Sequence, residues 1–536
     1  KTNQSRNKVK GSDMEQMKAK VAWGDIAGIL LLTAGMAMLG VSVFLCFSND
    51  IWYDELFTMG LAGRPLGDLV AITAKDVHPP LYYIIARCFL LLGKAINGNV
   101  DPVIVVKLVS VLPFFLCFLY AVTIIRKEFG MLCAGLFFFL LLSMPQLAGY
   151  TVEMRMYGYA LFFVTAGMLH AYFLTGDRPG KKIRKLHWAA LTFYAAAACY
   201  THYFACVAAL MVYVYLFVEA WAGRRLKQRI KPFLLSGCIC GAGYLPWLFT
   251  AVVSQVETVK GSYWIMPLTV RTLGGCVKFL FLPSLGHEVL NVLAAAGVFF
   301  LFAVAFLVFM FRGIKKGVGT DRQQAVFDAG CIGVLLGIVL FGFAASLLIR
   351  PIFVYRYMLP AMGCMWLAFA IAISKSKSGK RIVVPILVLL FVIGIRNYRS
   401  FYGEEMWKRV QMEQTKEALL QIDPEDSLVF NFDQTQGIVS YYLANDSYLW
   451  YGNPEELICR MYPQNKSLVE GEFDDGEGIR RLKELLGENR QVWFLGSGQA
   501  REEILEKWQA EGISAEKVSE AMLERYPDLL LEGCSG

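Results

Sequence analysis

Residues 25–45 read DIAGILLLTAGMAMLGVSVFL, an apolar run that follows a lysine-rich stretch at the start of the chain. A run of about 18 or more apolar residues is long enough to cross a bilayer as a helix. Comparable runs recur as far as residue 398, and only 18% of the chain is charged, less than in typical soluble proteins. The sequence therefore predicts an α-helical polytopic membrane protein. The first run lacks a small-residue cleavage site, so we interpret it as a retained span.

Lysine and arginine placement predicts the topology, because basic loops stay on the cytoplasmic side. A basic tail occupies residues 1–25, and further basic clusters lie at residues 126–127, 178–185, 224–231, 312–316 and 375–381. Placing all of them inside predicts about eleven spans, a cytoplasmic N-terminus and an extracytoplasmic C-terminus. The predicted spans are residues 26–46, 103–125, 131–149, 157–175, 188–203, 204–221, 233–251, 290–311, 326–349, 357–374 and 382–398.

The segment 47–102 is then a long outer loop of a transmembrane domain that covers residues 26–400. Its apolar stretch 81–93 is too short to cross the bilayer comfortably. Counting it as a span would move every later basic cluster to the outer side of the membrane. We interpret it as an interfacial helix on the outer leaflet, where Tyr82 and Tyr83 suit the headgroup zone.

The composition becomes that of a soluble protein over residues 401–536. Residues 427–433 and 491–496 are typical of buried strands, and residues 436–444 and 501–510 of helices. We expect a small extracytoplasmic α/β domain. The sequence Gly-Ser-Gly at 496–498 falls short of a dinucleotide-binding motif and is interpreted as a tight turn.

Two polar clusters fall in the outer loop. Asp54 and Glu55 follow the first span, where paired acids can serve as a general base or a metal ligand, or begin a helix as acids of its first turn. His78 precedes Pro79 and Pro80, which fix the backbone and start the interfacial helix. His78 then faces a site, or is an interfacial polar residue.

Two more clusters lie at the predicted outer ends of spans. Glu153, Arg155 and Tyr157 either alternate along an extended segment or share one side of a helix. They belong to a site or form a structural ion pair. Arg356 and Tyr357 follow the ninth predicted span. An arginine there binds phosphate through paired N–H donors of its planar guanidinium group, or extends to the lipid headgroups.

Taken in order, the Asp-Glu pair, the HPPLYY motif at 78–83, the Glu-x-Arg-x-Tyr motif and the Arg-Tyr-x-x-Pro motif resemble a known family. It is the bacterial branch of the protein mannosyltransferase-like (family 39-like) GT-C fold glycosyltransferases, which includes the aminoarabinose transferases of lipid A. The resemblance covers about residues 20–400, while the C-terminal domain carries no recognised motif. It implies transfer of a sugar from a polyprenyl phosphate to an acceptor on the outer face of a bacterial cell membrane.

The resemblance also implies roles for particular residues. The acids fall on Asp54, with Glu55 beside it, and on Glu153, where many relatives have aspartate. The expected donor-phosphate residues are Arg155, Arg356 and Tyr357, and the expected substrate-binding residues are His78, Tyr82, Tyr157 and His202. Some relatives bind zinc through a glutamate where this chain has Val77, so we expect a metal-free site. His78 and His287 are fallback ligands if a divalent metal binds.

The expected partners are the lipid-linked sugar, membrane lipid, and an acceptor that is a glycolipid, a wall polymer or a protein. Nucleic acid is not expected, because the basic clusters are short and lie between spans. The 13 cysteines fall mostly in apolar runs and suggest no metal site. The alternatives are a transporter or a lipid-linked sugar flippase, and a non-catalytic scaffold. The enzyme hypothesis requires that Asp54, Glu153 and Arg356 meet in one pocket.

Overall fold

The computed structural model describes residues 2–48, 50–175, 180–252, 255, 265–315, 319–376, 379–451, 473, 476–488, 490–520 and 530–535. The chain forms two compact units. The bundle unit comprises Lys1–Cys46, Thr73–Tyr82 and Lys107–Tyr402, and the sheet unit comprises Phe47–Ile72, Tyr83–Val106 and Gly403–Gly536.

The bundle unit is built of helices, most of them apolar along their whole length. Its helices are α1 (Thr2–Leu45), α5 (Pro102–Tyr120, continued by Ala121–Ile125 and α6, Arg126–Phe129), α7 (Met131–Ser143), α8 (Tyr157–Thr175), α9 (Lys181–Cys199), α10 (Tyr203–Ala222), α11 (Leu226–Trp247, continued by Leu248–Val252), α13 (Val270–Phe281), α14 (Glu288–Lys315), α15 (Thr320–Leu348), α16 (Leu359–Ser374) and α17 (Lys380–Leu419), with 3-10 turns at Gly149–Thr151 and Tyr355–Met358. Within the described ranges, nine helices are long and apolar enough to cross a membrane.

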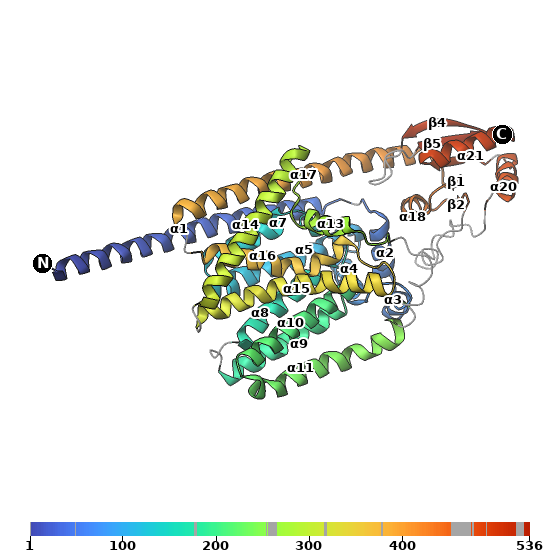
Figure 1. Ribbon diagram of the computed structural model, residues 1–536. Helices are drawn as coiled ribbons and strands as arrows, with labels where there is room; N and C mark the ends of the chain where they lie inside the picture. Colours follow the sequence, from blue (N-terminus) through green and yellow to red (C-terminus); the bar gives the residue numbers. More distant parts are fainter. Residues whose placement is uncertain are drawn as a thin grey trace. The chain divides into compact units, whose positions relative to one another are not determined.

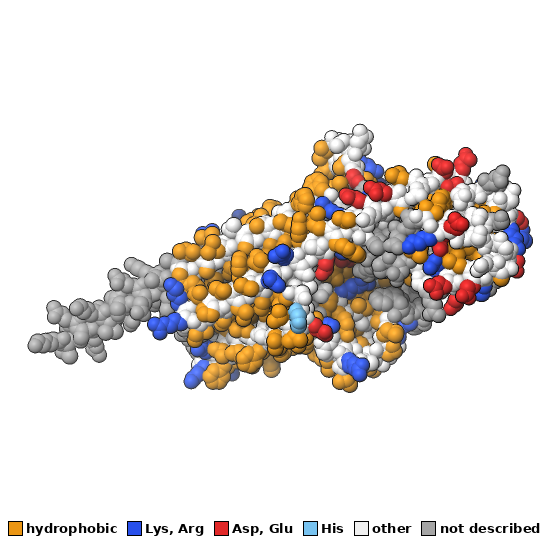
Figure 2. Space-filling view, turned by 90° about the horizontal axis from the view of Figure 1, so that it is seen from above, with side chains coloured by type: hydrophobic (Ala, Val, Ile, Leu, Met, Phe, Trp, Pro, Cys, Tyr) orange, Lys and Arg blue, Asp and Glu red, His pale blue; other side chains and the backbone are white. Residues whose placement is uncertain are grey.

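Two of the predicted spans fall outside that set of nine. α7 is shorter than its predicted range, and α9 begins with the basic sequence KKIRK, which lowers its hydropathy. α8 and α16 are almost wholly buried and form the centre of the bundle, in contact with α7, α10 and α15. α8 to α11 lie side by side (Figure 1). Hydrophobic side chains cover much of this unit's surface in Figure 2, as expected for helices that face lipid.

Two glycines allow α1 and α7 to pack closely. α1 and α7 cross at Gly28 and Gly135, where a Cβ atom on either residue would clash with the backbone of the other helix. Small residues at helix crossings let membrane helices approach closely and gain dispersion contacts. The predicted first span therefore packs on the third through two glycines.

The basic turns gather at one end of the bundle. Arg225 and Arg229 donate to the carbonyl oxygen of Thr175, at the end of α8, with N–O distances of 3.2 and 2.8 Å. At the same end, Gln323 donates to Thr175 Oγ1 at 3.0 Å. The opposite end carries the starts of α8, α10 and α16 and the ends of α9 and α15.

The sheet unit combines the loop after α1 with the C-terminal part of the chain. The loop contributes α2 (Tyr53–Gly63), α3 (Leu66–Thr73) and most of α4 (Leu81–Ile96). The C-terminal part contributes β1 (Ser427–Phe430), α18 (Asp433–Tyr442), β2 (Asp446–Leu449), α20 (Glu477–Gly487), β3 (Val492–Gly496), α21 (Gly498–Ala510), β4 (Ser514–Glu520) and β5 (Leu530–Ser535). The strand order is β2-β1-β3-β5-β4, in which β1, β2 and β3 are parallel and β5 is antiparallel to both of its neighbours.

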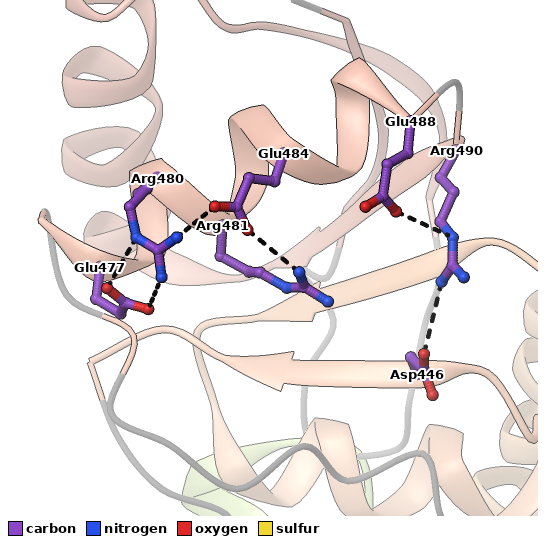
Figure 3. A network of polar contacts seen from close by, with 7 residues as sticks. All are labelled: Asp446, Glu477, Arg480, Arg481, Glu484, Glu488 and Arg490. Carbon is purple, nitrogen blue, oxygen red and sulfur yellow. Dashed lines mark hydrogen bonds and ion pairs between the residues drawn. The ribbon is translucent and has the colours of Figure 1, made fainter.

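The sheet is buried on both faces. One face packs Leu428 and Phe430 against the end of α17 and against α18. The other packs Val492 and Phe494 against α20 and α21, with Trp508 at its centre. The solvent side of this unit is charged (Figure 2). Figure 3 shows one such array, in which Arg480 pairs with Glu477 and Glu484 on the solvent-facing side of α20, and exposed pairs of this kind contribute little to stability.

Candidate functional site

A turn between the Gly149–Thr151 3-10 helix and α8 carries Glu153 and Arg155. The backbone N–H of Arg155 donates to the carbonyl oxygen of Glu153 at 2.8 Å, so residues 153–156 form a turn and the helix begins only at Tyr157. The helical alternative for this motif is therefore wrong. Thr151 anchors the turn, because its hydroxyl donates to Ser42 Oγ on α1 at 2.8 Å.

His202 lies at the centre of the site as the N-cap of α10. The backbone N–H of Phe204 donates to Nδ1 of His202 at 3.1 Å, which leaves the ring proton of the neutral form on Nε2. The side chain is 3% exposed. Burial, followed by electrostatic interactions with neighbouring His78, Arg155 and Arg356, holds the pKa of His202 well below its ordinary value. His202 is therefore neutral at physiological pH.

Aromatic rings surround this histidine. Its ring centre lies 5.1 Å from that of Tyr357 and 5.4 Å from that of Tyr157. Tyr157 packs edge-to-face on Tyr150, 5.2 Å between ring centres. The guanidinium carbon of Arg356 lies 6.0 Å from the centre of the Tyr157 ring, within the range of a cation–π contact. These rings form one wall of the site.

The charges of the site converge on that wall. Burial and the carboxylate of Glu153 raise the pKa of Tyr150 well above its ordinary value, while Arg356 and Arg155 act in the opposite direction. One carboxylate and two guanidinium groups thus act on a single tyrosine. Arg155 is buried and Arg356 is half-buried. A concentration of positive charge that faces a bundle interior is typical of a substrate site.

The loop before α4 brings in the HPPLYY motif. His78 Nδ1 lies 3.0 Å from Asp76 Oδ2, and the His78 ring lies 6.1 Å from the His202 ring. α4 begins at Leu81, directly after the two prolines, as predicted. The N–H of Leu81 donates to the carbonyl oxygen of Tyr200 at 3.0 Å, which ties the motif to the α9–α10 turn.

A polar chain that the sequence did not reveal supports this loop. Trp247 Nε1 donates to the hydroxyl of Tyr203 at 3.2 Å, and that hydroxyl bonds Gln255. Gln255 then donates to the carbonyl oxygen of Thr73 at 2.8 Å. Tyr203 follows His202 directly, so the chain connects α10, α11 and the His78 loop. A glutamine near the end of an apolar run is the only sequence signal for it.

The remaining predicted residues are Tyr82, in the bundle unit, and Asp54 and Glu55, in the sheet unit. Tyr82 is buried in the bundle core, with its ring 5.9 Å from that of Tyr159 and its hydroxyl 3.4 Å from Ser110 Oγ. Asp54 and Glu55 belong to the sheet unit and occupy the first turn of α2. Glu55 is buried and accepts the backbone N–H of Trp52 at 3.3 Å, the geometry of a capping residue.

The described side chains do not fit a metal ion. Among the described residues, no three or more His, Cys, Asp and Glu side chains lie close enough together to hold a metal ion. Of the two fallback ligands, His78 bonds Asp76, whereas His287 is exposed and precedes α14.

Comparison with known proteins supports the fold. No family model matches the chain, and no curated protein matches its sequence. Two crystal structures of ArnT from Cupriavidus metallidurans, one apo and one bound to undecaprenyl phosphate, match 94% of this chain and 97% of theirs, with a TM-score of 0.57 at 13% identity. AglB from Archaeoglobus fulgidus, an archaeal oligosaccharyltransferase solved with an inhibitory peptide and a dolichol-phosphate, matches over 86% of this chain and 69% of its own, with a TM-score of 0.45 at 12% identity.

The chain therefore has the GT-C fold: a polytopic bundle of membrane helices with a small C-terminal sheet domain. More particularly, its architecture is that of ArnT, as the resemblance of the motifs predicted.

Proposed function

We propose that this protein is a glycosyltransferase that moves a sugar from a polyprenyl-phosphate carrier to an acceptor on the outer face of the membrane. The observation that carries the proposal is the convergence of Arg155 and Arg356 on one buried aromatic wall, beside a neutral His202. Guanidinium groups bind phosphate oxygens through paired N–H donors, and burial strengthens such bonds. The structural neighbour ArnT binds undecaprenyl phosphate, which is a ligand of this chemistry.

In this proposal the two arginines bind the carrier phosphate and stabilise the charge that it gains as the leaving group. Asp54 accepts the proton of the acceptor hydroxyl or amine. The acceptor atom bonds the anomeric carbon while the bond from that carbon to the phosphate oxygen breaks, and the electron pair stays on the phosphate. One displacement of this kind inverts the anomeric centre. Glu153 binds the acceptor or orients Arg155.

The distribution of charge supports transfer on the outer face. His202, Arg356 and the Glu153 turn lie where α10, α16 and α8 begin, whereas the basic turns lie at the opposite ends of these helices. Because basic turns stay in the cytoplasm, the site end would face outward. Nucleotide binding is not needed, since the carrier phosphate already activates the sugar.

The test uses purified protein in lipid nanodiscs with lipid-linked sugars extracted from membranes of the source cells. We expect release of free polyprenyl phosphate that requires the protein. Asp54→Asn should slow that release by about 10²–10⁴-fold, the usual contribution of a positioned general base. Full release by Asp54→Asn would remove Asp54 from this role. Absence of protein-dependent release from every extract would contradict the proposed function itself.

A further inference from the structure

The helix that carries Asp54 packs on the C-terminal domain. α2 contacts α18 within the sheet unit, although the two helices are far apart in the sequence. Tyr53, the first residue of α2, packs against the cluster that includes Ile438 of α18 and Leu428 of β1. The side chain directly before Asp54 is therefore part of the packing of the C-terminal domain.

A polar contact fixes the segment that leads into α2. Tyr442, at the end of α18, packs against the same cluster as Tyr53, and the backbone of Ile51 and the carboxylates of Asp50 and Glu55 act on its hydroxyl. Burial raises the pKa of Tyr442 well above its ordinary value, so the hydroxyl keeps its proton. Ile51 is itself buried, and a buried backbone group needs such a partner.

The other end of α2 is held by α4. Arg87 Nη1 donates to the carbonyl oxygen of Ala62 at 3.4 Å, and the ring of Phe57 packs edge-to-face on Tyr83, 5.7 Å between centres. Glu55 caps the first turn through Trp52. Asp54 thus follows a segment whose backbone is fixed by a side chain of the C-terminal domain, on a helix held at both ends.

We propose that Tyr442 is a positioning residue for Asp54, and that the C-terminal domain serves to order the start of α2 for transfer. This inference rests on the proposed function, since it assigns Tyr442 a role through the base. A small displacement of a catalytic group costs up to about 10²-fold in rate, so loss of one anchoring bond should be measurable. The domain would then be a structural part of the catalytic machinery.

The test compares Tyr442→Phe, which keeps the ring and removes the hydroxyl, with Tyr451→Phe in the same domain. Tyr451 is exposed, and its hydroxyl accepts from Lys507 Nζ at 2.7 Å. Both variants are measured as full chains by hydrogen–deuterium exchange over residues 50–58, by undecaprenyl phosphate binding, and by release of polyprenyl phosphate from lipid-linked sugars.

For Tyr442→Phe we expect exchange over residues 50–58 to be about 10-fold faster and release about 10-fold slower, with undecaprenyl phosphate binding unchanged. Tyr451→Phe should match wild type in all three. Unchanged exchange in Tyr442→Phe, or faster exchange with wild-type release, would overturn the inference. If the wild-type protein releases no polyprenyl phosphate, the proposed function is wrong, and the catalytic part of the inference is wrong with it. The exchange measurement then tests separately whether Tyr442 orders the start of α2.

Discussion

The guanidinium carbon of Arg356 lies 6.0 Å from the centre of the Tyr157 ring, and that ring lies 5.4 Å from the ring of His202. The arginine follows α15, the tyrosine begins α8 and the histidine begins α10, so three helix ends produce the arrangement. An aromatic face holds a guanidinium group by cation–π attraction and leaves its N–H donors directed outward. We therefore propose that the carrier phosphate binds at this end of the bundle.

Arg356→Ala should weaken undecaprenyl phosphate binding by about 10–100-fold, because a hydrogen bond to a charged group contributes about 1.5–3 kcal/mol. Arg356→Lys should recover only part of the affinity, since lysine lacks the planar fork. Arg312→Ala provides the matched control, because Arg312 is exposed in the last turn of α14. Binding can be measured by native mass spectrometry in nanodiscs. Equal affinities for Arg356→Ala and Arg312→Ala would contradict the assignment.

His202 should make stability fall in mild acid. Its pKa is lowered in the folded state, so below the ordinary histidine value of about 6.5 the unfolded chain takes up a proton that the folded chain excludes. At pH 7.5 this group therefore leaves the stability unchanged. The stability decreases as the pH falls below the ordinary histidine pKa of about 6.5. His202→Asn keeps a side chain that can cap α10 but does not titrate. Its melting temperature should fall less than that of wild type between pH 7.5 and 5.5; equal falls would show that His202 does not carry the effect.

Much of the bundle was predictable from the sequence. α8 has the predicted bounds of its span, because its apolar run is bounded by the Glu-x-Arg-x-Tyr turn and a basic loop. The Pro-Pro pair likewise fixed the start of α4. Hydropathy did not predict the end of a helix that continues from an apolar into a polar segment. α17 extends to Leu419, well past the predicted end at residue 398, because a helix does not stop where its surface becomes polar.

The structure brings together several residues that the sequence singled out, and it holds them through contacts that the sequence did not reveal. His78, Arg155, His202 and Arg356 come together because they share one end of the bundle, which the charge pattern indicated. Contacts such as that of Tyr442 with Ile51 depend on how distant segments pack, which no local pattern encodes. Strand β4 was also missed, because SAEKVSE has little apolar alternation.

Trp508→Ala should destabilise the C-terminal domain by about 3–5 kcal/mol, the usual cost of a large cavity in a core. Trp508 is fully buried, with its ring 5.0 Å from that of Trp450 and 4.8 Å from that of Phe494. Trp407→Ala, at a residue that is 50% exposed on α17, makes the same chemical change outside the core. Limited proteolysis should cleave the C-terminal part of Trp508→Ala faster than that of Trp407→Ala, and equal rates would show that Trp508 is not central to the core.

The topology predicts that the C-terminal domain lies outside the cytoplasm. Alkaline phosphatase fused after residue 536 should be active and green fluorescent protein at the same place should be dark, because each reporter folds on one side only. A fusion after Lys315, at the basic end of the bundle, should give the reverse pattern. A fluorescent C-terminal fusion would invert the orientation and place the site in the cytoplasm.

The most direct test of sugar transfer is mass spectrometry of surface glycans in cells from which this chain has been deleted. We predict that one class of glycan, on a glycolipid, a wall polymer or a protein, loses a sugar while the lipid-linked form of that sugar accumulates. Wild-type chain should restore the glycan, whereas the Arg155→Ala, Arg356→Ala double variant should not. An unchanged surface glycan profile after deletion, with no accumulated carrier, would contradict the account.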